Sequence, residues 1–225
     1  MTHNKPTLLF ILLLFFTTVS CKKTIIPFSN VIELKNSPTS PTDEGLNAFF
    51  DLGSWMGFAL SDDKTTTGFS GPYILGVEHG IWVSNNFTSL DLVDENDNSL
   101  LRNLNYSEQN YFPGKLENQL HFEDIELISN LIFTSDKSAI ISSKIINKGT
   151  QNLIFTPQWK GEIFDEIGDL INNDTVLITL LDKNQKIFLR PINNKEFNIL
   201  TDSNKYVFIL NNIILKPKES KTYTI

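Results

Sequence analysis

Cysteine is almost absent from this chain, and the single one that occurs, Cys21, has no second cysteine with which to pair. An intramolecular disulfide and a thiolate metal cluster are therefore excluded, because both need more than one sulfur. The fold must be held together by side-chain packing. With 40% hydrophobic and 11% aromatic residues among 225, the chain has enough apolar material for one sizeable β domain or two small ones.

Basic charge is also in short supply. The 19 lysines and arginines are outnumbered by 26 aspartates and glutamates, which gives a formal net charge of -7. No run of lysines or arginines forms the basic stripe that a nucleic-acid surface requires. We therefore exclude nucleic acid as a partner.

The familiar catalytic and metal-binding motifs are missing as well. His3 lies in the amino-terminal segment, while His79 and His121 are isolated and have no second ligand at metal spacing. There is no G-x-S-x-G elbow, no P-loop and no G-x-G-x-x-G, so we expect no metal and no cofactor. Paired carboxylates could still hydrolyse a glycosidic bond. Most acidic residues here fall in polar, turn-like clusters, however, and solvated loop charge is the favoured interpretation.

The amino-terminal segment, MTHNKPTLLFILLLFFTTVSC, has the pattern of an export signal. A short polar start with Lys5 precedes an apolar run at 8–16 that is too short to span a bilayer, followed by small residues. The ending TTVSC resembles a bacterial lipobox, which implies a signal peptide over 1–20 and lipid attachment at Cys21. Thr18 departs from that pattern, where an aliphatic residue is usual, and an ordinary cleaved signal is the alternative. We predict an exported, membrane-anchored lipoprotein, periplasmic or at the cell surface.

Residues 22–45 contain three prolines and end in the polar, turn-rich stretch SPTSPTDEG, so we predict a flexible tether over 21–45 that leads into a domain spanning 46–225. Whether that domain is complete at its carboxyl end is left open.

From Phe49 onward the chain consists of short segments rich in Ile, Val, Phe and Leu with a period of two, separated by turn clusters. This spacing predicts an all-β fold, a sandwich or barrel of antiparallel strands with one face of each strand in the core. The expected strands lie at 73–84, 90–94, 125–135, 138–147, 152–164, 175–182, 186–192 and 205–217. One or two short helices are expected at 165–173 and around the sequence SEQNYF (107–112).

The stretch from 47 to 72, NAFFDLGSWMGFALSDDKTTTGFSGP, concentrates aromatic residues, glycines and acids. It resembles the start of the amino-terminal domain of bacterial glycoside hydrolase family 63, a family of α-glucosidases that act on glucosyl-containing oligosaccharides. A weaker similarity follows in the WKGE sequence, at Trp159, Gly161 and Glu162. The residues that carry the resemblance in the first half are Phe49, Phe50, Asp51, Leu52, Gly53, Trp55, Gly57, Gly68, Phe69, Gly71, Ser84, Asn85 or Asn86, and Phe87.

The resemblance implies an antiparallel super-β-sandwich that precedes a large toroid of paired helices. In that family the toroid supplies both the general acid, an Asp, and the general base, a Glu, and the reaction inverts the anomeric carbon. No position of this chain matches those motifs, so we assign no catalytic residue.

Aromatic faces stack on sugar rings while carboxylates accept hydrogen bonds from hydroxyls, so Asp51, Trp55 and Phe69 are the candidates for lining a substrate pocket. The alternative for Trp55 is packing within the sandwich or against the toroid. For Trp82 and Trp159 we expect a place in the core or at an interdomain contact.

Three functional hypotheses follow. The first is a non-catalytic domain of a family 63-like α-glucosidase, truncated or split, whose helical catalytic partner is encoded separately. The second is an independent exported lipoprotein that binds gluco-oligosaccharide. The third is a structural remnant that has no ligand.

Overall fold

The structure is a computed structural model that describes residues 28–76, 79–172, 175–180, 184–192 and 197–225. Every secondary-structure element in those residues is a β-strand, and all strand pairs are antiparallel. The prediction of an all-β, antiparallel fold is thereby confirmed. The predicted signal peptide at 1–20 and the predicted lipid site Cys21 lie outside the described residues. In the described part of the chain, no helix is long and apolar enough to cross a membrane.

One large sheet has the strand order β16-β8-β7-β6-β5. Four of these strands are consecutive in the chain and are joined as hairpins, which fixes their registers locally. The strands are β5 (Tyr106–Phe112), β6 (Lys115–His121), β7 (Ile125–Ser135), β8 (Ser138–Asn147) and β16 (Ser220–Thr224).

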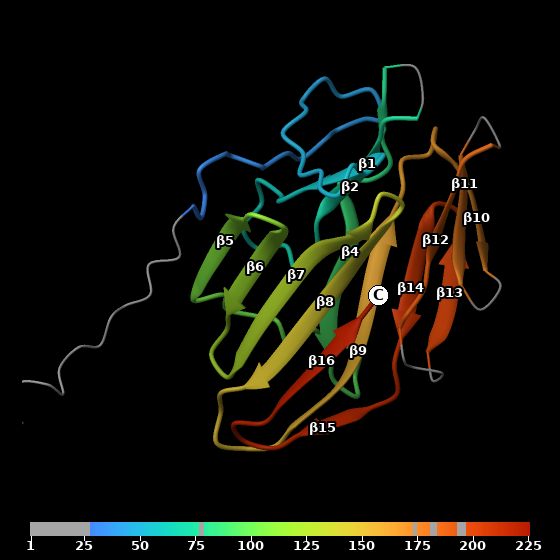
Figure 1. Ribbon diagram of the computed structural model, residues 1–225. Coiled ribbons are helices and arrows are strands. Elements are labelled where there is room, and N and C mark those ends of the chain that lie inside the picture. The colour runs from blue at the N-terminus through green and yellow to red at the C-terminus, as the bar shows by residue number, and fades with distance from the viewer. Residues whose placement is uncertain (1–27, 77–78, 173–174, 181–183, 193–196) are drawn as a thin grey trace, which may run out of the picture.

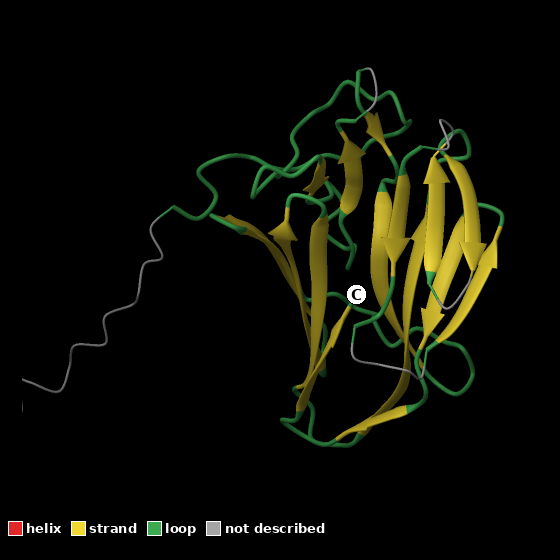
Figure 2. Cartoon of the chain, turned by 45° about the vertical axis from the view of Figure 1, so that its right-hand side comes forward, coloured by secondary structure: helices red, strands yellow, loops and turns green. Residues whose placement is uncertain are grey.

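The second large sheet is built around β9 (Leu153–Glu162), which pairs with three other strands. Figure 2 shows this sheet facing the first, so that the two form a sandwich. Its remaining strands are β4 (Asn86–Val93), β13 (Asn198–Asp202), β14 (Lys205–Ile209) and β15 (Ile213–Leu215).

The core lies between these two sheets. In β6 the burial of side chains alternates strictly, because successive side chains of a strand point to opposite faces. Leu116 and Leu127 from the first sheet and Trp159 and Phe208 from the second are at most 1% exposed and belong to the same apolar cluster.

Two smaller sheets adjoin the sandwich (Figure 1). The first consists of β1 (Met56–Ala59), β2 (Ser70–Ile74) and β3 (Ile81–Trp82), and its buried Ala59, Tyr73 and Trp82 form a separate small apolar cluster. The second consists of β10 (Gly168–Asn172), β11 (Val176–Leu180) and β12 (Lys186–Leu189), with β10 close to β13. In this sheet β12 is an edge strand that pairs only with β11 among the described strands.

Both helix predictions are wrong. The spacing of Ile167, Leu170 and Ile171 fits a helical turn, but the segment Gly168–Asn172 instead pairs with β11 over five consecutive residues. A continuous ladder with a neighbouring strand satisfies backbone groups that a single helical turn leaves unpaired.

The sequence SEQNYF lies in β5, which pairs with β6 across a two-residue turn at Pro113 and Gly114. Gly114 has φ of 87°, and a proline followed by a glycine with positive φ is the signature of a type II turn. That turn makes the segment one arm of a hairpin.

The segment predicted as a tether contacts the domain over its described part. The Asn36 N–H donates to the Leu60 carbonyl oxygen, and the Leu60 N–H donates to the Leu34 carbonyl oxygen, both at 2.9 Å. Further along, Trp82 N–H donates to Pro41 O at 2.9 Å, and the Trp82 indole N–H donates to Gly45 O at 3.1 Å. Residues 34–45 thus lie against the first small sheet.

Candidate functional site

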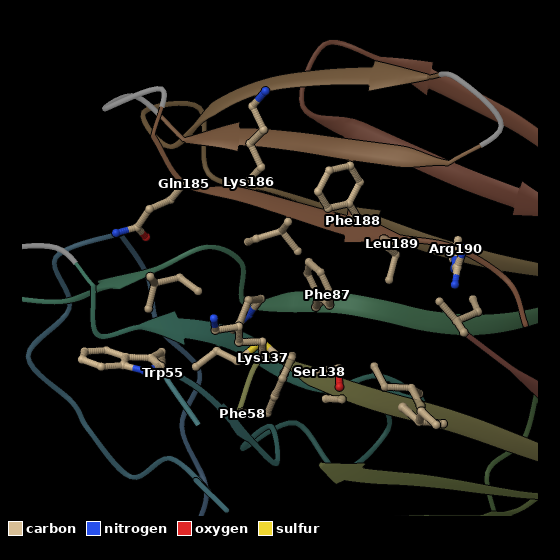
Figure 3. Close-up of a pocket in the computed structure, with 18 of the residues that line it drawn as sticks. Trp55, Phe58, Phe87, Lys137, Ser138, Gln185, Lys186, Phe188, Leu189 and Arg190 are labelled. Atoms are coloured by element: carbon tan, nitrogen blue, oxygen red, sulfur yellow. The ribbon is translucent and has the colours of Figure 1, made fainter. Parts of the chain in front are cut away.

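A cavity of about 1000 Å³ lies between the start of β8 in the first large sheet and the small sheet that contains β11 and β12. One wall comes from the turn before β8 and the first residues of that strand, Asp136–Ile141, and the opposite wall from the segment Asn184–Arg190, which contains β12 (Figure 3). The stretch around Trp55 and Met56, where β1 begins, lies at one end of the cavity. Its volume is within the range of pockets that hold small ligands.

The floor of the cavity is apolar because it is the interior of the sandwich. Phe58, Phe87, Ile141 and Ile225 line it, and each is at most 5% exposed. Ile225 is held there by two backbone hydrogen bonds with Ile141, both of 2.9 Å. The floor of the cavity is therefore made of buried core residues.

Trp55 is one of two strongly exposed aromatic residues at the cavity, with 61% of its surface accessible, the other being Phe188 on β12. Its backbone is fixed on two sides, since its N–H donates to Asp136 O at 3.2 Å and its carbonyl accepts from Leu75 N–H at 2.9 Å. The indole is thus carried on a fixed backbone at the mouth. Of the predicted pocket residues, Trp55 is the one that lines the cavity.

Asp51 does not line the cavity and instead holds the turn before Trp55. Its carboxylate accepts the Leu52 N–H at 2.8 Å, and its carbonyl accepts the Ser54 N–H at 2.9 Å. Leu52 and Gly53 have φ of 52° and 70°, which such a turn requires. The role of Asp51 here is to shape the loop that presents Trp55.

Phe69 has no exposed surface, lies in the main apolar cluster and does not line this cavity. The strand that follows, β2, is covered on both faces, and all five of its residues are buried. Trp82 and Trp159 are 0% and 1% exposed and lie in the core, the first of the two alternatives for them.

Cations dominate the rim of the cavity. Lys137, Lys186 and Arg190 line it, whereas Asp136 is the sole acidic side chain among its described lining residues. Two carboxylates facing one space are needed for hydrolysis of a glycosidic bond by an acid and a base. The cavity therefore lacks that pair among the residues that the structure describes.

The carboxylates whose pKa values shift are engaged elsewhere. Burial alone would raise the pKa of Asp91 and Glu126, but hydrogen bonds and ion pairs, including those with Lys160 at 2.9 Å and Lys148 at 3.1 Å, lower both values. The pKa of Asp94 is lowered chiefly by the Asn98 N–H. A general acid needs a raised pKa, so these lowered values fit structural roles.

No group of three or more His, Cys, Asp or Glu side chains is positioned to hold a metal ion within the described ranges.

Comparison with known proteins identifies the family. Residues 36–207 match the family described as "Glucosidase YgjK, N-terminal", which is well over half of the 225 residues. The chain belongs to this family of glucosidase N-terminal domains. The sequence-based resemblance to the amino-terminal domain of a glucosidase is thereby confirmed.

The fold of this glucosidase N-terminal domain also occurs in a solved structure named "Putative kojibiose phosphorylase from human microbiome". The TM-score is 0.50 at 13% sequence identity, and the match covers 76% of this chain. At this identity the likeness concerns the fold alone. The chain corresponds to 28% of the length of that protein.

Sequence reasoning missed the cationic rim of the glucosidase N-terminal domain. Lys137 lies in a turn and Lys186 begins β12, and both were ordinary strand-flanking charges in the sequence. They face one cavity because the large sheet that contains β8 and the small sheet that contains β12 lie on opposite sides of it. A single sequence contains no signal for that juxtaposition.

Proposed function

We propose that the chain is the non-catalytic β domain of a family 63-like α-glucosidase and acts together with a helical catalytic domain. The observation that carries this proposal is the family match over 36–207 combined with a cavity that has one described acidic side chain, Asp136. Since hydrolysis with inversion needs both an acid and a base, the chemistry would come from the partner domain. The β domain would support that partner and shape one side of its substrate site.

The test is glucose release from α-linked gluco-oligosaccharides by the purified chain, alone and with a separately expressed helical catalytic domain. We expect no release by the chain alone and a gain when the two are mixed. Glucose release by the chain alone that is lost in Asp136→Asn would overturn the proposal. So would a helical domain whose activity is unchanged by the chain and which does not co-purify with it.

A second candidate function, binding of gluco-oligosaccharide by the chain itself, is supported by the exposure of Trp55 at the cavity mouth. An indole face at the edge of a pocket suits the apolar face of a sugar ring. Because Trp82 and Trp159 are buried, a fluorescence change on binding would come chiefly from Trp55. Saturable quenching that disappears in Trp55→Phe would support this function, and equal quenching in both proteins would contradict it.

For the location of the chain we propose a lipid anchor at Cys21, as the TTVSC sequence suggests. Labelling of cells with radioactive palmitate should mark the wild-type chain and not Cys21→Ser. An unlabelled wild-type chain would contradict the anchor.

A further inference from the structure

The outer edge of β12 has backbone groups that face away from its one described neighbour. Leu180 N–H donates to Gln185 O at 3.1 Å, which marks these two residues as a hydrogen-bonded pair. Hydrogen-bonded and non-hydrogen-bonded pairs alternate along an antiparallel ladder. Ile187 and Leu189, which lie two and four residues after Gln185, are therefore also in hydrogen-bonded pairs with β11. Lys186 and Phe188 therefore turn their N–H and C=O groups to the free edge, beside the cavity.

The side chains along this edge have an ordered pattern. Lys186, Phe188 and Arg190 are exposed and share one face, because they are two residues apart, and Phe188 is 66% accessible. Ile187 and Leu189 point to the other face, where Leu189 is only 7% exposed. A cation therefore stands on each side of an exposed phenylalanine.

These cations have no carboxylate partner in the described part of the chain. The ion pairs found there use Lys115, Lys148, Lys160 and Lys205 instead. Lys137, on the opposite wall of the cavity, adds a third positive charge to the same space. The electrostatic complement of this edge is a segment with carboxylates.

A second copy of the chain does not fit the edge. Antiparallel pairing of two β12 strands about Phe188 would place Lys186 of each copy opposite Arg190 of the other, and like charges directly opposite are destabilising. Lysine on an edge strand is a common protection against such self-association.

We propose that the free edge of β12 binds an extended acidic segment of a partner polypeptide, which adds a strand to the sheet. The partner segment has carboxylates opposite Lys186 and Arg190 and an apolar residue opposite Phe188. Its intervening residues are apolar and enter the cavity beside Ile187 and Leu189. In this mode of recognition the main chain supplies affinity and alternate side chains supply specificity. The site is independent of whether the chain binds sugar.

Two synthetic peptides test the charge pattern, one with the core Glu-Val-Phe-Val-Glu and one with Lys-Val-Phe-Val-Lys. Calorimetry should detect binding of the acidic peptide and at least tenfold weaker binding of the basic one, a ratio on the order of that expected for two cross-strand charge pairs. The double variant Lys186→Glu/Arg190→Glu should reverse the preference. A matched control, Lys64→Glu/Lys144→Glu, makes the same charge change at exposed lysines elsewhere and should leave it unaltered.

Methylated peptides test the strand pairing itself. Methylation of the phenylalanine N–H in the acidic peptide removes a donor that faces Phe188 and should abolish binding. Methylation of the N–H of the second valine, which points away from the edge, should leave binding intact.

Three results would overturn the proposal. The first is failure of the acidic peptide to bind, and the second is equal binding of both methylated peptides, which would indicate side-chain attraction without strand pairing. The third is a dimer of the chain that Lys186→Glu/Arg190→Glu alters, which would show that a second copy occupies the edge.

Discussion

The core between the two large sheets is filled by side chains, whereas the space beside β12 is an open cavity. Around β6, β7 and β9 the facing side chains interlock, and Leu116, Leu127 and Leu131 have no exposed surface. Around β12 the same kinds of residue line an open cavity, and Phe188 is 66% exposed. Strands with similar composition thus have opposite environments.

The difference teaches that the alternating pattern decides which face of a strand a side chain takes, but the number of neighbouring strands decides whether the backbone groups of that strand are paired. β9 pairs with three strands, whereas β12 pairs with one of those described. A surface for a partner is therefore to be sought at the strand with fewer neighbours. Substitutions in the filled core should therefore lower the free energy of unfolding more than substitutions at the open cavity.

The largest effect is expected for Trp159→Ala at the filled end. Trp159 is 1% exposed and contacts the rings of Phe197 and Tyr223 at 5.5 and 5.4 Å between centroids. The substitution should lower the free energy of unfolding by about 3–5 kcal/mol, because it leaves a cavity the size of an indole. Urea denaturation measures the loss, and Trp159→Phe should recover part of it. A loss below about 1 kcal/mol would contradict the description of this end as filled.

An intermediate effect is expected for Asp91 on β4, which accepts a hydrogen bond from Ser99 at 2.6 Å and pairs with Lys160 at 2.9 Å. These contacts lower its pKa below the ordinary 3.8 in spite of burial. A lowered folded pKa stabilises the protein above 3.8, and that contribution is lost as the pH falls through the folded value.

Asp91→Asn should therefore lower the free energy of unfolding by about 1 kcal/mol at neutral pH, the pair being partly exposed. It should also flatten the dependence of that free energy on pH below 3.8. Urea denaturation over a pH series measures both quantities. Asp136→Asn, at the exposed turn by the cavity, is the control and should leave the free energy of unfolding at neutral pH unchanged. If the free energy of unfolding of Asp91→Asn depends on pH as that of the wild type does, the pairing of Asp91 does not stabilise the fold.

The smallest effect on stability is expected for Trp55→Ala at the open end. Because 61% of this side chain is accessible, its loss should change the free energy of unfolding by less than about 0.5 kcal/mol. The same denaturation experiment that shows a large loss for Trp159→Ala makes the comparison direct. Similar losses for the two variants would show that the mouth of the cavity is closed in solution.

Much of the sandwich could be predicted from the sequence, because alternation and turn residues are local signals. The expected strands at 125–135 and 138–147 coincide with β7 and β8, and their hairpin turn contains Asp136 and Lys137. The sequence predicts helix at 165–173 and around 107–112, where the structure has strands, because apolar spacing over so few residues fits both periods. In both cases pairing with the next strand along the chain decided the conformation.

The candidate site was less predictable, because its residues come from segments that are far apart in the chain. Trp55 could be singled out since it stands beside two glycines in a sequence typical of the family, but Phe69 in the same stretch is buried. Its burial depends on residues further along the chain, such as Phe87, whose N–H donates to the Phe69 carbonyl oxygen. The meeting of Lys137 with Lys186 and Arg190 requires the whole topology, and pattern reasoning on one sequence does not reach it.

The contact of residues 34–45 with the first small sheet has a practical consequence for where the domain can be cut. Trp82 donates two hydrogen bonds, one to the carbonyl oxygen of Pro41 and one to that of Gly45, and it has no exposed surface. A fragment that begins at residue 46 would leave the indole N–H without its acceptor and uncover the ring. Fragments for expression and crystallisation should therefore begin before Leu34.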